Sequence, residues 1–292
     1  MFKNILTAVI IIAGAGIYAM GGRVALPPSS SVGGMSPATM EEKVLPPAGV
    51  ILPIRWGNLG KQMTAAGVID REKFQQLYMS RGGLTAEIKS MLDGENNDEI
   101  RITPANAGAM LNLLWAFGLG SKNDILEAGP MADKKYGGDG PPAGGFASTG
   151  GWTLAKGDAM DHYSRHQFFN LTSDQQTLVE RVSKGIYRPC CGNSTYFPDC
   201  NHGMAMLGLL ELMAAQGVSE EEMYRTALAV NSYWFPDTYL TLATYMKNKG
   251  VDWSEVNPQE ILGINYSSGQ GFAKIASQVA APSRSQGGGC GA

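Results

Sequence analysis

The sequence predicts a mostly α-helical globular body that follows an N-terminal transmembrane anchor and a flexible linker. Helix-capping signals recur along the middle of the chain, whereas the alternation of polar and apolar residues that is typical of strands is scarce. Of the 292 residues, 44% are hydrophobic, which is enough to bury a substantial core. We therefore expect an irregular multi-helix domain over residues 54–281.

Residues 1–23 are predicted to anchor the chain in a membrane. No charged side chain occurs from Asn4 to Gly22, and this stretch is long enough to cross the hydrocarbon layer as a helix. Lys3 precedes it, which favours a single pass with the amino end in the cytoplasm and the globular part on the extracytoplasmic side of the cell membrane. A cleaved signal peptide is the main alternative, and a cytoplasmic protein with a buried first helix is the other.

Three further segments have the composition of irregular chain. Residues 24–53 are rich in Pro, Ser and Gly, and we expect them to form a flexible linker. Residues 282–292 form a predicted flexible Gly-rich tail that carries Cys290. The Gly- and Pro-rich residues 136–154 predict a long loop between two helical halves of one domain.

Individual helices are predicted from side chains that cap their first turns. The predicted starts are Asp70 before residues 71–79, Thr85 before 86–92, Thr103 and Pro104 before 105–119, Ser173 with Gln176 before 175–184, Ser219 with Glu222 before 221–235, and Pro236 before 238–249. The best strand prediction covers residues 99–102.

Charge and motifs exclude several classes of function. The 23 basic and 26 acidic residues are mixed along the chain, so no basic surface for nucleic acid is expected. The glycine-rich middle segment lacks the GxxxxGK[ST] pattern of a phosphate-binding loop, and no GxSxG motif is present. Whether the protein is an enzyme stays open at this level.

Metal-binding residue types are concentrated in one part of the chain. All three histidines and three of the four cysteines lie between His162 and His202. Cys190, Cys191, Cys200 and His202 belong to a turn-rich segment, residues 187–203, which we call the knuckle and which leads into an apolar helix. Three thiolates and one imidazole match the ligand set of zinc and also suit copper(I). We expect these four side chains to converge on one ion.

His162 and His166 are secondary candidates for metal binding. They are four residues apart in a segment, Asp158 to Phe169, that we expect to be helical, so both imidazoles would lie on one face. They would complete the knuckle site or form a second one.

The favoured function is that of a membrane-anchored extracytoplasmic protein that binds zinc or copper, with an unspecified protein partner. Two alternatives use the same cysteines. In a thiol-disulfide oxidoreductase, Cys200 would be the nucleophile and Cys190 or Cys191 the resolving thiol. In an interaction scaffold, Cys200 would be bonded to Cys190 or Cys191, and the remaining one to Cys290.

Overall fold

The computed structural model describes residues 38–136 and 142–280. Its α-helices are α1 (Met40–Val44), α2 (Leu59–Ala66), α3 (Arg71–Met79), α4 (Ala86–Asp93), α5 (Ala107–Gly120), α6 (Asp124–Ala128), α7 (Ala147–Gly150), α8 (Ser173–Gly185), α9 (Asn201–Ala215), α10 (Glu220–Trp234), α11 (Pro236–Asn248), α12 (Pro258–Leu262), α13 (Ile264–Ser267) and α14 (Gly269–Ala276). The 3₁₀ helices are Pro130–Ala132, Lys134–Tyr136, Pro142–Gly145, Ala159–Asp161 and Trp253–Glu255. Strands β1 (Val50–Leu52) and β2 (Ile100–Ile102) form one antiparallel pair.

The prediction of a mostly helical body is confirmed, and so are most of the predicted helix starts. The side chains of Asp70, Thr85 and Ser219 accept hydrogen bonds from the first-turn N–H groups of α3, α4 and α10. The predicted capping box of α8 is wrong by one residue, because Thr172 pairs with Gln175 instead. Helix α5 begins at Ala107, after a turn through residues 104–106.

The predicted linker, residues 24–53, extends too far towards the body. From residue 38 onward the chain is part of the fold: Thr39 caps α1 with a complete capping box, and β1 pairs with β2. Val44 and Leu52 are buried in the hydrophobic core. Pairing with a strand about 50 residues away explains the error, since local composition carries no sign of such a partner.

Helices α5 and α9 form the centre of the body. They pack against each other more extensively than any other two elements, and nearly every residue of both is buried. The helices cross where Gly118 meets Gly208: a Cβ atom on Gly118 would lie 2.2 Å from the carbonyl oxygen of Met204. Only glycine fits at this crossing, because backbone occupies the space that a side chain would need. The crossing positions the first turn of α9, which carries His202.

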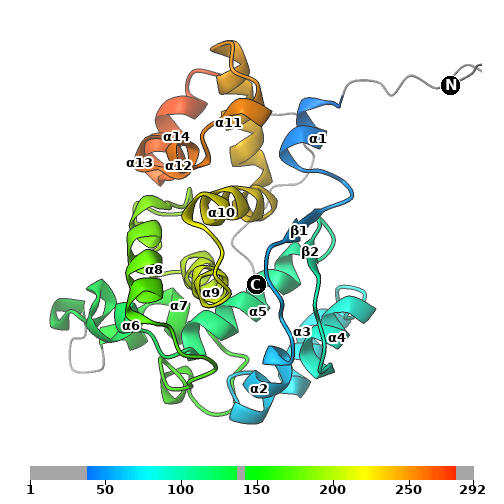
Figure 1. The fold of residues 1–292 in the computed structure, drawn as a ribbon, viewed down its shortest axis with the longest axis vertical. Helices are drawn as coiled ribbons and strands as arrows, with labels where there is room; N and C mark the ends of the chain where they lie inside the picture. Colours follow the sequence, from blue (N-terminus) through cyan, green and yellow to red (C-terminus); the bar gives the residue numbers. More distant parts are fainter. Residues whose placement is uncertain (1–37, 137–141, 281–292) are drawn as a thin grey trace, which may run out of the picture. The chain divides into compact units, whose positions relative to one another are not determined.

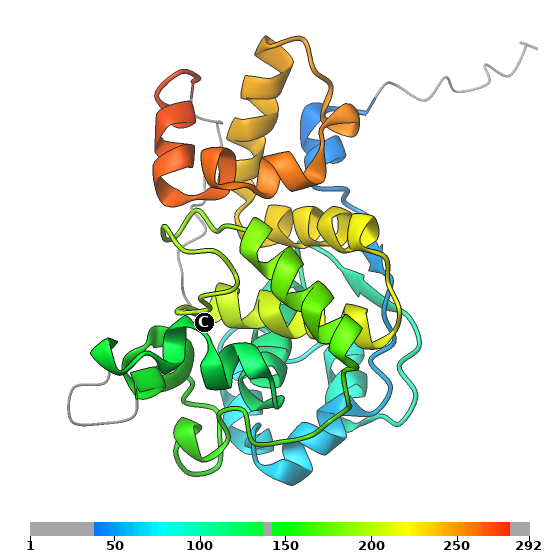
Figure 2. The same ribbon diagram turned by 60° about the vertical axis from the view of Figure 1, so that its left-hand side comes forward.

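The remaining helices surround this pair. In Figures 1 and 2, α2, α3 and α4 lie at one end of the body, and α11 to α14 gather with α1 at the other. Helix α8 packs across α9, and α10 continues into α11 at Pro236. The knuckle therefore enters α9 between the central helix pair and the C-terminal helices.

The predicted middle loop contains short helical turns in its described part, among them Pro142–Gly145 and α7. Within residues 38–136 and 142–280, no helix combines the length and the apolar character that a membrane crossing requires. The predicted anchor (residues 1–23), the first part of the predicted linker (residues 24–37) and the predicted tail (residues 282–292) lie outside the described residues.

Candidate metal centre

The knuckle is held in place by hydrogen bonds from both sides. After α8, the chain turns back so that Tyr187 and Ser194 form an isolated antiparallel bridge. Thr195 donates its N–H to the carbonyl oxygen of Ile186 at 2.8 Å, and the N–H of Gly269 donates to the carbonyl oxygen of Cys191, also at 2.8 Å. The knuckle is therefore tied to the end of α8 through Ile186 and to the first residue of α14 through Gly269.

Cys200 is the N-cap of α9. Its Sγ accepts a hydrogen bond from the N–H of Gly203 at 3.4 Å, in the position where a Ser or Asp oxygen usually lies. The free N–H groups and the positive end of the helix dipole at this terminus stabilise negative charge. The thiolate form of Cys200, which is the form that binds metals, is favoured here.

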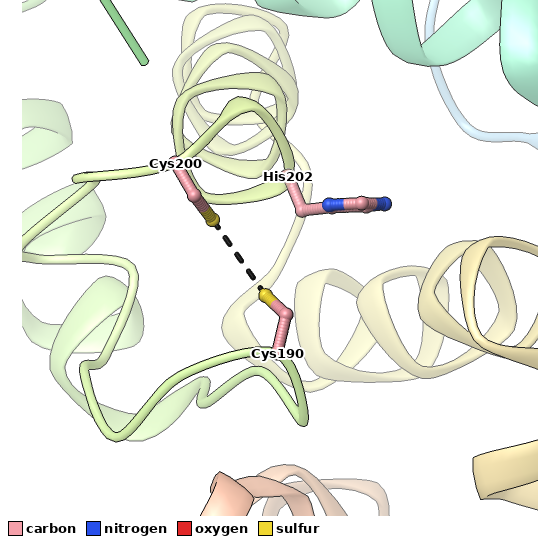
Figure 3. Close-up of side chains that lie close together, drawn as sticks. All are labelled: Cys190, Cys200 and His202. Carbon is pink, nitrogen blue, oxygen red and sulfur yellow. Dashed lines mark hydrogen bonds between the residues drawn. The ribbon is translucent and has the colours of Figure 1, made fainter. Parts of the chain in front are cut away.

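The structure brings Cys190, Cys200 and His202 together. The two Sγ atoms are 3.7 Å apart, and one ring nitrogen of His202 lies within 4.8 Å of both. Figure 3 shows the two cysteine side chains pointing toward one another, with the imidazole beside them. A disulfide would require about 2.05 Å between the sulfurs. Two thiolates at about 2.3 Å from one tetrahedral zinc ion lie about 3.8 Å apart, so the observed spacing fits shared coordination.

His202 contributes a buried nitrogen that has no partner. The residue is only 4% exposed, and its ring packs against Phe235, with centroids 4.3 Å apart, and edge-on against Trp234. Its Nδ1 makes no hydrogen bond in the described part of the protein. Because a buried polar atom without a partner is costly, this nitrogen indicates a ligand beside it.

Cys191 belongs to a neighbouring group. Its Sγ, the Cys200 Sγ and a carboxylate oxygen of Asp199 lie within 4.8 Å of one another. However, Asp199 already accepts hydrogen bonds on both oxygens, from Arg188 Nη2 at 2.6 Å and from Asn193 Nδ2 at 2.8 Å. A second cation at this place would compete with the guanidinium group for the same carboxylate.

Arg188 is a further residue of the candidate site, and the sequence patterns did not single it out. Its side chain is completely buried beneath the cysteines, and it pairs with Asp199 and with the carbonyl oxygen of Phe197. Among the described residues its Nε and Nη1 find no hydrogen-bond partner, and a Cβ atom on Gly203 would lie 2.7 Å from its Cζ. The available signal was its place two residues before Cys190, since a cation close to thiols stabilises their anionic form.

The thiols of the cluster differ in pKa. Hydrogen bonds from Cys190 and Cys191, with smaller contributions from His202 and the charge of Arg188, lower the pKa of Cys200. Hydrogen bonds to Cys191 and Cys200, together with burial, raise the pKa of Cys190. Of these two thiols, Cys200 is therefore the one whose thiolate form is favoured, and a cation bound to both sulfurs would displace the proton of Cys190.

His162 and His166 lie outside this cluster. The predicted helix over Asp158 to Phe169 is wrong: after the turn Ala159–Asp161 the chain bends at Ser164, whose φ is 53°. The two rings still meet, with His162 Nδ1 and His166 Nε2 3.0 Å apart. They border the end of α5, where the N–H of His166 donates to the carbonyl oxygen of Gly120.

The hydrogen bonds of the histidine pair determine which nitrogens carry protons. His162 Nε2 must donate to the carbonyl oxygen of Lys156, 2.8 Å away, because a carbonyl only accepts. In neutral His162, Nδ1 then accepts from His166 Nε2. Burial, followed by the nearby charge of His162, lowers the pKa of His166. In this hydrogen-bonded arrangement His162 has no nitrogen free to bind an ion.

The described cysteines, Cys190, Cys191 and Cys200, are free thiols. The alternative bridge between Cys200 and Cys190 or Cys191 is thus not formed, and a bridge to Cys290 would fall outside the described residues. Comparison with known protein families, with curated proteins and with solved structures finds no match to this chain.

Proposed function

We propose that this protein binds one metal ion through Cys190, Cys200 and His202. The observation that carries the proposal is the sulfur pair at 3.7 Å beside a buried imidazole whose Nδ1 has no hydrogen-bond partner in the described ranges, 38–136 and 142–280. Two thiolates and one imidazole form a ligand set that zinc accepts in tetrahedral geometry. Copper(I) prefers the same soft donors and is the alternative ion.

The fourth coordination position is left to solvent in this proposal. Cys190 is exposed, so the site lies at the surface, and Cys191 is turned towards Asp199 and the carbonyl oxygen of Asn193. Structural zinc sites use four protein ligands, whereas sites with three keep a position for water or an incoming group. This arrangement favours an exchangeable ion over a purely structural one.

Thiol-disulfide exchange is the second function that the cluster favours, because Cys190 and Cys200 are close together and Cys200 is activated as a thiolate. Metal binding ranks first because Nδ1 of His202 is buried and makes no hydrogen bond among the described residues, and a bound ion would satisfy it. The scaffold hypothesis needs permanently oxidised cysteines, and the three described ones are free.

The proposed location is the outer face of the cell membrane, with the body held there by residues 1–23. The support is the charge pattern: Lys3 is followed by 19 uncharged residues, Asn4 to Gly22. Alkaline extraction of membranes should leave the chain in the pellet. Its release into the supernatant would exclude the anchor.

Metal analysis of the full-length chain, purified without chelator, tests the proposed site. We expect one zinc or copper ion per chain. Cys190→Ser, Cys200→Ser and His202→Gln should each lower the affinity by more than about 100-fold, because loss of a direct ligand exceeds the 10- to 100-fold cost of losing an outer partner.

Two matched variants serve as controls. Cys191→Ser removes the adjacent thiol and His166→Gln removes an imidazole outside the cluster, and both should keep one ion per chain. Circular dichroism of each variant establishes that it is folded. The assignment would be overturned if Cys200→Ser kept the full metal content. It would also be overturned if Cys191→Ser lost as much metal as Cys200→Ser.

A further inference from the structure

The two proposed sulfur ligands come from different segments and differ in exposure. Cys200 is fixed as the N-cap of α9, whereas Cys190 is exposed and lies in a bend that Gly192 follows with open space around it. Their Sγ atoms, 3.7 Å apart, need to approach by only about 1.7 Å to reach disulfide bonding distance. Rotation of the exposed Cys190 side chain, with a small shift of its backbone, supplies that movement.

We propose that the metal site is controlled by oxidation: formation of a disulfide between Cys190 and Cys200 expels the bound ion. This inference rests on the proposed function, since it concerns the same ligands. The disulfide removes both sulfur ligands in one event, because a sulfur in a disulfide carries no thiolate charge to hold the cation. His202 is then the only one of the three proposed ligands that remains, and a single imidazole binds a metal ion weakly.

The oxidant is a small disulfide such as oxidised glutathione, and the step balances. In the zinc-loaded site, where the ion has displaced the proton of Cys190, the exposed Cys190 thiolate attacks one sulfur of the oxidant. This step forms a mixed disulfide and expels one thiolate. The Cys200 thiolate then attacks the Cys190 sulfur, forms the Cys190–Cys200 bond and expels the second thiolate. The protein loses two electrons, the oxidant gains two, and the zinc ion leaves with its charge unchanged.

Other pairings among the described cysteines fit less well. The Sγ of Cys191 is 3.9 Å from both Asp199 Oδ1 and the carbonyl oxygen of Asn193, and these contacts would have to break before it could bond to the Cys200 Sγ, which lies within 4.8 Å of it. A bond between the sequence neighbours Cys190 and Cys191 would strain the intervening peptide. The geometry therefore selects Cys190 and Cys200 as the pair that oxidation joins.

The test uses the full-length zinc-loaded chain, titrated anaerobically with oxidised glutathione. A chromophoric chelator follows the free zinc, and peptide mass mapping identifies the disulfide. We expect one zinc released for each Cys190–Cys200 disulfide, and one zinc taken up again after reduction with dithiothreitol. Cys191→Ser keeps both reacting sulfurs and should show the same release.

The possible outcomes distinguish a failure of redox control from a failure of the proposed metal binding. Oxidation without release, or release that accompanies a bond involving Cys191 or Cys290 in place of Cys190–Cys200, overturns redox control and leaves metal binding intact. A reduced chain that takes up no zinc at all overturns both. The mass mapping of that metal-free chain then shows whether the sulfur pair serves thiol exchange alone.

Discussion

Gly118→Ala is expected to destabilise the body by about 3 kcal/mol, at the upper end of the usual cost of overpacking a core. A Cβ at this position would lie 2.2 Å from the carbonyl oxygen of Met204, and one on Gly208 would lie 2.7 Å from that of Leu114. Backbone atoms cannot rotate away as a side chain does, so α5 and α9 must separate. Urea unfolding followed by circular dichroism measures the change.

Gly108 offers a control in the same helix. It is exposed near the start of α5, and an added Cβ would meet nothing within 4 Å. Gly108→Ala should therefore stabilise the body by up to about 1 kcal/mol, because alanine is the better helix former. If both substitutions shift the unfolding midpoint in the same direction and by similar amounts, Gly118 is not needed for the close packing of α5 against α9.

Arg188→Met is expected to cost about 3 kcal/mol of stability and to weaken metal binding. The substitution keeps most of the buried volume but removes the cation that pairs with Asp199 at 2.6 Å. Breaking a buried pair in this way is costly because the remaining charge loses its partner. The thiolates above it lose a stabilising positive charge as well. Chemical denaturation and a zinc competition titration measure the two effects.

Arg181 provides the matched comparison. It pairs with Glu220 at 2.8 Å, but 55% of its side chain is exposed, so Arg181→Met should cost less than about 1 kcal/mol and leave metal affinity unchanged. Arg188→Lys should lie between the two, since it restores the charge without the planar guanidinium group. If Arg188→Met lowers stability and metal affinity no more than Arg181→Met does, the buried cation does not stabilise the site.

The parts of the fold that could be predicted from the sequence are those that local chemistry determines. Asp70, Thr85 and Ser219 cap their helices as expected, because an N-cap bond spans only two or three residues. The sequence predicted that Cys190, Cys191, Cys200 and His202 converge, since a turn-rich segment of 17 residues, 187–203, limits how far these side chains can separate. The structure brings Cys190, Cys200 and His202 together and places Cys191 in a neighbouring group.

What could not be predicted depends on distant contacts or on a single unusual torsion. The pairing of β1 with β2 places Val50 opposite Ile102, and no local sequence pattern indicates this pairing. The expected helix around His162 is interrupted by a left-handed Ser164, a conformation that residues other than glycine seldom adopt. Arg188 looks like an ordinary surface arginine in the sequence, and only the fold shows that it is buried.

Metal-edge X-ray absorption spectroscopy of the zinc-loaded, reduced full-length chain tests the central claim most directly. The account predicts two sulfur neighbours at about 2.3 Å, with one imidazole nitrogen and one further light atom at about 2.0 Å. A first shell of nitrogen and oxygen alone would contradict it, because the ion would then lie somewhere other than between Cys190 and Cys200.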